Sequence, residues 1–177
     1  GIDLLIGYEK GALAKKELFQ SWGMELVIIE PFIEVRKTWS DKPHPKKYFK
    51  VPQNSHILTT ISHSLESRIS SDMVWAIAEI IKRNPNTYYM TMGEIQKPKA
   101  FMNQFKIFGV EQNIKMLGNV SNPSHLARSM DLYLNEFPFG GGLAILDAMA
   151  ASCPIISMYD KYGPTQARNG GTFYGLD

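Results

Sequence analysis

Residues 132–157 read LYLNEFPFGGGLAILDAMAASCPIIS, and this stretch decides the fold that the sequence predicts. Its first residues, Leu132–Leu134, form a short apolar run typical of a buried strand. Three glycines follow at positions 140–142, and a helical pattern then runs from Gly142 to Ala151. The apolar run Pro154–Met158 predicts the next strand. Strand, glycine loop, helix and strand together form one unit of a parallel α/β sheet.

The sequence between residues 56 and 131 repeats this alternation of short apolar runs and helical patterns. Its architecture is therefore predicted to be an α/β fold, with a Rossmann-like parallel sheet and helices on both faces. We predict strands over His56–Ser62, Thr87–Met92 and Ile114–Leu117, and helices over Met73–Arg83, Lys99–Phe108 and His125–Met130, the last of them capped by Ser124.

The first 55 residues divide into two parts. Residues 1–33 contain a strand–helix–strand pattern, in which Ala12–Trp22 is the predicted helix between strands Asp3–Tyr8 and Glu25–Ile29. Residues 34–55 are rich in proline and in charged side chains, which is typical of a linker or an irregular crossover. We therefore predict a domain boundary there, with the basic cluster Lys42–Lys50 as a solvated loop.

The composition is that of a soluble globular protein, because 44% of the residues are hydrophobic and 20% are charged. A formal net charge of +2 is too small to indicate nucleic acid as a partner. Cys153 is the single cysteine, which fits a reducing compartment, so we expect a cytoplasmic protein. The chain starts inside a strand-like run without a methionine, and we expect it to be a piece of a larger protein.

The glycine loop carries the chemistry that the sequence suggests. Glycines let the backbone approach a ligand closely, and the first turn of the following helix offers unpaired N–H groups and the positive end of its dipole. Phosphate groups bind in such places. Asp147 lies one turn further along the helix, where its carboxylate could accept hydrogen bonds from ribose hydroxyls. The pattern favours a nucleotide, although three glycines can also serve a turn alone.

The run from Phe137 to Ser157 resembles the donor-binding motif of GT-B-fold glycosyltransferases. It has an acidic residue in the helix, a tail of small residues and a proline before the next strand. In the large retaining families, a glutamate, seven other residues and a second glutamate form this motif. Here Asp147 takes the second place and Phe139 stands at the first. The spacing from Phe137 and Pro138 to the acid instead resembles the O-linked N-acetylglucosaminyltransferases and their bacterial relatives.

The resemblance extends to other positions and implies roles for them. Arg68, after the first strand of the domain, would meet the donor diphosphate from the opposite side of the cleft, unless it is a surface arginine paired with Glu66 or Asp72. Glu136 and His63 are the catalytic candidates, although either could be an ordinary loop residue. Glu94 and Asn119 would lie near the nucleotide. The implied donor-binding residues are Arg68, Phe139, Gly140, Gly141, Gly142, Leu143, Ala144, Asp147, Gly118, Thr165 and Gln166.

The resemblance also implies a domain organisation and a reaction. Residues 1–33 would be a remnant of the N-terminal domain, residues 34–55 the linker, and residues 56–177 the donor-binding domain, truncated at its C-terminal end. The implied enzyme transfers a sugar from a nucleoside diphosphate sugar, with UDP favoured, to a glycan or protein acceptor held by the other domain. No Asp-x-Asp motif is present, so we expect no metal and no cofactor. The missing part could associate peripherally with a membrane, and this fragment alone is expected to be inactive.

Three alternatives stay open or are disfavoured by the sequence. A non-catalytic module of the same fold, serving a partner subunit, would explain why Phe139 replaces a glutamate. A nucleotide-sugar epimerase or a phosphorylase would share the fold. A dinucleotide-binding oxidoreductase is disfavoured, because residues 62–68 after the first strand of the domain lack the G-x-G-x-x-G fingerprint.

Overall fold

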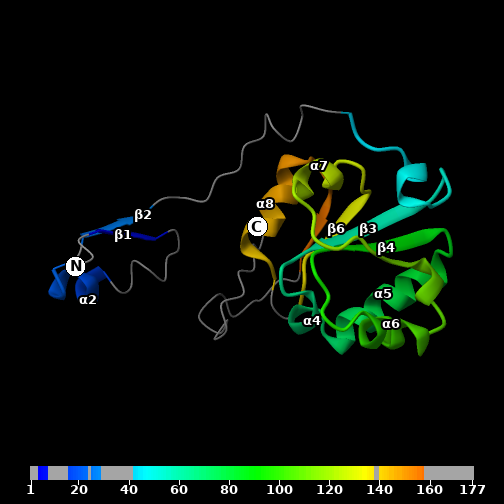
Figure 1. The fold of residues 1–177 in the computed structure, drawn as a ribbon, viewed down its shortest axis with the longest axis horizontal. Coiled ribbons are helices and arrows are strands. Elements are labelled where there is room, and N and C mark those ends of the chain that lie inside the picture. The colour runs from blue at the N-terminus through cyan, green and yellow to red at the C-terminus, as the bar shows by residue number, and fades with distance from the viewer. Residues whose placement is uncertain (1–3, 8–15, 24, 29–41, 138–139, 158–177) are drawn as a thin grey trace. The chain divides into compact units, whose positions relative to one another are not determined.

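The computed structural model describes residues 4–7, 16–23, 25–28, 42–137 and 140–157 (Figure 1). The chain divides into two compact units, residues 1–33 and residues 34–177. In the first unit, strands β1 (Leu4–Gly7) and β2 (Glu25–Ile28) pair in parallel, and helix α2 (Lys16–Ser21) lies between them in the sequence. The described part of this unit therefore has the predicted strand–helix–strand order; residues 12–15 of the predicted helix lie outside it.

The second unit is built on a five-stranded, all-parallel sheet in the order β5-β4-β3-β6-β7. The strands are β3 (His56–Ile61), β4 (Thr87–Met92), β5 (Ile114–Met116), β6 (Leu132–Leu134) and β7 (Ile155–Ile156). The chain proceeds outward from β3 to β5 and then returns to place β6 on the other side of β3. The strand order therefore reverses between β3 and β6, and open α/β sheets bind ligands at the carboxyl ends of the strands at such a point.

Helices cover both faces of this sheet, which confirms the predicted Rossmann-like α/β fold. Figure 1 shows α5 and α6 on one side of the strands and α7 and α8 on the other. The described helices of the second unit are α4 (Leu65–Arg68), α5 (Ser71–Arg83), α6 (Pro98–Lys106), α7 (Pro123–Ala127) and α8 (Gly142–Ala150), with 3-10 turns η1 (Lys46–Phe49) and η2 (Glu111–Asn113). None of the helices in the described ranges is long and apolar enough to cross a membrane.

The first face of the sheet is packed against α5 and α6. The Ser70 side chain caps α5 by accepting a hydrogen bond from the Met73 N–H at 3.2 Å. Beyond the cap, the predicted apolar stripe of this helix is buried against strand residues that include Leu58 and Tyr89. The helix residues buried in this layer are Met73, Val74, Ile77, Ala78, Ile81, Phe101 and Phe105.

The second face is packed against α7 and α8, and it also buries part of the predicted linker. Phe49 and Val51 lie in the same cluster as Tyr133 and Ala148. Lys46 makes an ion pair with Asp131, at the amino end of β6. The segment from Lys42 to Lys50 is therefore not only a solvated loop, because Phe49 is part of the core and Lys46 is paired.

Two local features differ from the sequence predictions. Helix α7 is capped by Asn122 rather than by Ser124, because the Asn122 Oδ1 accepts the His125 N–H at 3.2 Å. Helix α4 was not predicted, since four residues are too few to show a helical period. The cap change moves no candidate site residue, whereas α4 carries Arg68.

Candidate functional site

The loops after three strands are drawn together at the carboxyl edge of the sheet. The Gly93 N–H donates to the Gly118 carbonyl at 2.7 Å, and the Ser62 N–H donates to the Met92 carbonyl at 2.9 Å. Gly93 has a φ of 138°, and a Cβ added to it would lie 1.8 Å from the Ser62 carbonyl oxygen. Only glycine fits at position 93, so this residue lets the ends of β3, β4 and β5 come together.

The glycine loop is anchored by the two residues that follow β6. The Gly141 N–H is shared by the Asn135 Oδ1 at 2.9 Å and the Glu136 Oε2 at 3.1 Å. The Asn135 amide also donates to the Ser157 hydroxyl at 3.0 Å, just beyond β7. These contacts hold the loop against the ends of β6 and β7 and fix the place where α8 begins.

Gly141 of this loop serves close packing rather than turn chemistry. Its φ is -79°, so no left-handed turn requires a glycine there. A Cβ at Gly141 would lie 3.2 Å from the Glu136 Oε2 and 3.6 Å from the Arg68 Nη1. The backbone therefore passes close to two charged side chains, and a larger residue at position 141 would crowd both.

Helix α8 begins at this loop without a capping side chain. Its N-cap is Gly141, and the first turn contains no acidic residue. The first-turn N–H groups, from Gly142 to Ala144, consequently have no side-chain acceptor among the described residues. Unpaired donors at the positive end of a nine-residue helix form a site for an anion such as a phosphate.

Arg68 is brought to the same place by helix α4. Leu65 is fully buried in the core, and the Glu66 carboxylate accepts the Lys97 N–H at 2.6 Å, which ties α4 to the start of α6. The Arg68 Nη1 then donates to the Gly140 carbonyl at 3.4 Å and lies 4.0 Å from the Glu136 Oε1. Its ion pair is thus with Glu136 rather than with Glu66 or Asp72, and its guanidinium stays one-third exposed, with 34% of its side-chain surface accessible.

Glu136, one of the two catalytic candidates, is a buried residue. Its side chain is completely buried, and the Oε1 atom has no hydrogen-bond partner among the described residues. Burial raises the pKa of Glu136, although its own backbone N–H, the Ser62 hydroxyl and Arg68 act in the opposite direction. In this structure Glu136 has no surface with which to contact a bound sugar. Its contacts are with Gly141 and Arg68 instead.

This burial makes a prediction about stability and pH. The raised pKa means that the folded state binds the Glu136 proton more tightly than the unfolded state, so stability falls as the pH rises from 4.5 through the folded pKa. Each pKa unit of that difference is worth about 1.4 kcal/mol. Glu136→Gln cannot ionise, so it should gain stability relative to the wild type between pH 5 and pH 8 in urea unfolding. Glu111→Gln, on η2, should follow the wild type, and parallel curves for Glu136→Gln would contradict the prediction.

The remaining predicted residues lie at varying distances from this centre. His63 is exposed in the turn after β3, and Leu143 is exposed on the first turn of α8. Asp147 is partly buried within α8, which raises its pKa. Gly118 follows β5, and its carbonyl accepts a hydrogen bond from the Gly93 N–H. Glu94 and Asn119 are exposed beside those glycines, whereas Phe139, Thr165 and Gln166 lie outside the described residues.

Sequence reasoning missed two residues that shape the site. Asn135 shares the Gly141 N–H with Glu136, and its only sequence signal is its position directly after a buried strand. Gly93 carries no clear sequence signal, because a single glycine does not reveal which carbonyl it approaches. Both act through contacts between segments that are far apart in the sequence.

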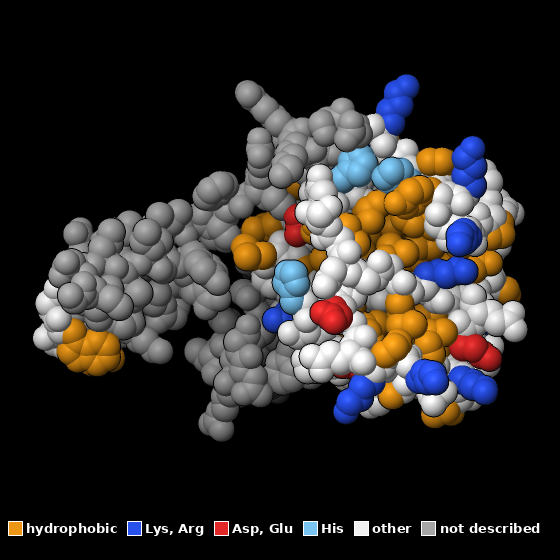
Figure 2. All heavy atoms as spheres, in the orientation of Figure 1, with side chains coloured by type: hydrophobic (Ala, Val, Ile, Leu, Met, Phe, Trp, Pro, Cys, Tyr) orange, Lys and Arg blue, Asp and Glu red, His pale blue; other side chains and the backbone are white. Residues whose placement is uncertain are grey.

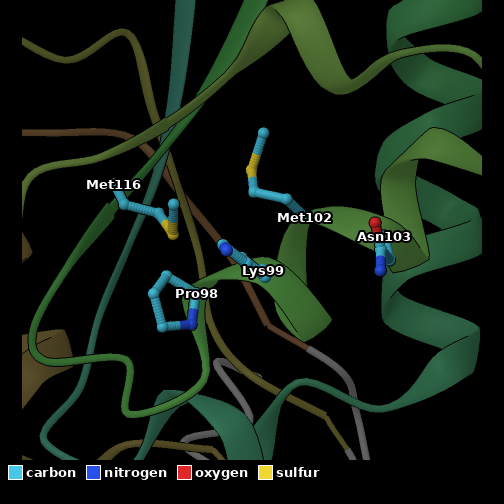
Figure 3. A pocket seen from close by; sticks show the side chains of 5 residues that line it. All are labelled: Pro98, Lys99, Met102, Asn103 and Met116. Carbon is cyan, nitrogen blue, oxygen red and sulfur yellow. The ribbon is translucent and has the colours of Figure 1, made fainter.

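One hollow on the described surface lies elsewhere. A shallow cavity of about 340 Å³ lies between α6 and the end of β5, lined by Pro98, Lys99, Met102, Asn103 and Met116 (Figure 3). It contains none of the residues discussed above, so we do not assign the site to it. Figure 2 shows lysine and arginine side chains scattered among apolar patches on the face in view, without a continuous basic stripe. Among the described residues, no group of three or more His, Cys, Asp or Glu side chains could hold a metal ion.

Comparisons with known proteins agree with this geometry. Residues 68–174 match the model of the family Glycosyl transferases group 1, which covers more than half of the chain. No curated protein sequence matches the chain.

Several solved structures share the fold. WaaG, a glycosyltransferase involved in lipopolysaccharide biosynthesis, has a TM-score of 0.65 and 20% identity over 85% of this chain and 43% of its own. The pneumococcal O-GlcNAc transferase GtfA, in complex with UDP and GlcNAc, has a TM-score of 0.62 and 18% identity over 92% of this chain and 31% of its own. Anabaena HepE, in complex with UDP and glucose, has a TM-score of 0.64 and 17% identity over 86% of this chain and 43% of its own. The chain thus spans less than half the length of these proteins.

Proposed function

Because the chain belongs to the group 1 glycosyltransferases, we propose that it binds the diphosphate of a nucleoside diphosphate sugar between Arg68 and the start of α8. The family match and the shared fold bear out the resemblance to GT-B glycosyltransferases. The observation that carries the proposal is the meeting of an exposed guanidinium with an uncapped helix start where the strand order reverses. Two sources of positive potential there suit a diphosphate.

Each part of the donor has a candidate partner. The N–H groups of the first turn of α8 bind one phosphate, and the Arg68 guanidinium binds the other through charge-assisted hydrogen bonds. The Asp147 carboxylate accepts the ribose hydroxyls, and the base lies near the joined glycines 93 and 118 at the neighbouring strand ends. The support for this order is the sequence of strand ends along one edge of the sheet.

The reaction is metal-independent in this proposal. When the sugar leaves, negative charge develops on the diphosphate oxygen, and preorganised donors stabilise such charge in a site that excludes water. Arg68 and the α8 dipole supply that stabilisation. UDP is the favoured nucleotide because GtfA and HepE, which share the fold, were solved with UDP. His63, exposed after β3, is the candidate for orienting the donor sugar or for transferring a proton.

The rest of the protein supplies the acceptor side. We assign residues 1–33 to the end of an N-terminal domain, residues 34–55 to the linker and residues 56–177 to the donor domain. The other domain holds the glycan or protein acceptor, so the 177 residues alone bind the donor without turning it over. Peripheral membrane association belongs to the part outside this chain, and the single buried Cys153 suits the reducing cytoplasm.

A non-catalytic donor-fold module is the second candidate. It is favoured by Phe139, which stands where the retaining families carry a glutamate. One of the similar structures is a GtfA/B complex, with a TM-score of 0.61 and 16% identity over 99% of this chain and 34% of the other. A full-length protein that binds UDP-sugar yet neither hydrolyses nor transfers it, unless a second subunit is added, would favour this module.

Calorimetric titration of the chain with UDP, GDP, ADP and NAD tests the proposal. We expect one nucleoside diphosphate, UDP, to bind preferentially and equally well with and without a chelator. Asp147→Ala should weaken UDP binding about tenfold, as expected for a lost hydrogen bond to a charged group. The same change should leave the affinity for pyrophosphate unchanged. Preferred binding of NAD, or loss of UDP binding with chelator, would overturn it.

A further inference from the structure

The guanidinium of Arg68 has two protein partners. Its Nη1 lies 3.4 Å from the Gly140 carbonyl oxygen and 4.0 Å from the Glu136 Oε1. Neither contact is a short, well-formed pair, and about a third of the side chain remains exposed. Arg68 can therefore turn toward a ligand at the start of α8 without breaking a strong interaction.

Glu136 has fewer ways to compensate its charge. One carboxylate oxygen accepts the Gly141 N–H, which Asn135 also shares, and the other has no hydrogen-bond partner among the described residues. The side chain has no exposed surface. Arg68 is the one described cation within ion-pair distance of it, so any ligand that draws Arg68 away leaves a buried carboxylate alone.

We propose that Glu136 competes with the donor diphosphate for Arg68, so that donor binding releases Arg68 from Glu136 and a proton from solvent binds the Glu136 carboxylate. The inference rests on the proposed function, because it uses the same diphosphate site. Glu136 is then a positioning residue, which acts through Arg68 and touches no part of the donor. It holds the guanidinium beside the glycine loop and competes with the diphosphate for it.

Every group that faces Glu136 is consistent with this exchange. Arg68 on α4 and the Ser62 hydroxyl after β3 favour the charged carboxylate, as does the Gly141 N–H. Tyr89 on β4 and Tyr133 on β6 are buried nearby. Burial together with the Glu136 charge raises the pKa of both phenols, so both stay neutral and add no charge beside Glu136. Burial already raises the pKa of Glu136. A diphosphate adds negative charge and removes the arginine, and both changes favour the protonated carboxyl.

The experiment compares UDP binding to the wild type and to Glu136→Gln from pH 6 to pH 9, in two buffers of different ionisation enthalpy. On binding UDP, the wild type should take up a fraction of a proton per molecule. Glu136→Gln should take up a smaller fraction, because its side chain cannot be protonated. UDP should bind Glu136→Gln about tenfold more tightly at pH 8, the size of one pKa unit of coupling. Comparing the proteins at each pH cancels the titration of the nucleotide itself. Glu79→Gln, the same change on the outer surface of α5, should match the wild type.

Two other outcomes would overturn the inference. If Glu136 contacts the sugar directly, Glu136→Gln leaves UDP binding unchanged and alters only the extra affinity of UDP-sugar over UDP. If Glu136 is an anchor for the glycine loop alone, Glu136→Gln keeps its acceptor for the Gly141 N–H, and neither affinity nor proton uptake changes.

A measurement without ligand separates this inference from the proposed function. The carboxyl carbon of Glu136 can be titrated by NMR in the wild type and in Arg68→Ala. If the pair is coupled as proposed, the pKa of Glu136 should rise by about one unit when Arg68 is removed. An unchanged pKa overturns the competition even if UDP binds, and failure of UDP to bind while the pKa rises overturns the proposed function instead.

Discussion

Replacing Gly93 with alanine is expected to remove much of the stability of the second unit. The new Cβ would lie 1.8 Å from the Ser62 carbonyl oxygen, far inside contact distance, and backbone rather than a flexible side chain would have to move. The φ of 138° is also disfavoured for a residue with a Cβ. Overpacking costs roughly 1–3 kcal/mol and a disfavoured backbone conformation about as much again, so we expect a loss of about 4 kcal/mol.

Urea unfolding followed by circular dichroism measures this loss. A domain of this size is stable by roughly 5–15 kcal/mol, so the midpoint should fall steeply or the protein should fail to fold. Gly109→Ala is the matched control, because Gly109 has a φ of 71° but no atom within 4 Å of an added Cβ. It should lose only about 1–2 kcal/mol, the cost of the left-handed conformation. Equal losses for the two variants would show that the contact with Ser62 does not matter.

Arg68→Ala is expected to weaken UDP binding roughly ten- to hundredfold, as expected when charge-assisted hydrogen bonds worth about 1.5–3 kcal/mol are lost. The guanidinium lies beside the start of α8, where its Nη1 donates to the Gly140 carbonyl at 3.4 Å. Removing it also takes away the described ion-pair partner of the buried Glu136 carboxyl.

Titration calorimetry with UDP measures the effect, and unfolding curves check that the variant is folded. Arg83→Ala is the control: Arg83 ends α5, pairs with Glu79 at 3.8 Å and is 79% exposed, so its loss should not change UDP affinity. Higher salt should reduce binding of the wild type more than that of Arg68→Ala. If Arg68→Ala and the wild type bind UDP with the same affinity, the diphosphate does not bind at Arg68.

Much of the fold follows from local patterns. The glycine loop and the helix after it are visible in residues 140–150 because glycine and the 3.6-residue period act within a few positions. The stripe of α5 and the branched residues of β3 and β4 are equally local, and the structure has these elements within a few residues of their predicted bounds. Short elements such as α4 carry too few residues for a period and were missed.

The sequence by itself therefore determined the element types, the parallel α/β class and the position of the glycine loop before a helix, since each depends on neighbouring residues. Only the tertiary structure decided that β6 pairs with β3, which brings Arg68 to Gly140, 72 positions away. It also decided that the Glu136 side chain is buried and that Phe49 is part of the core. Strand order and burial arise from contacts between segments that are far apart in the sequence. The periodicity of neighbouring residues does not specify which of these segments pair.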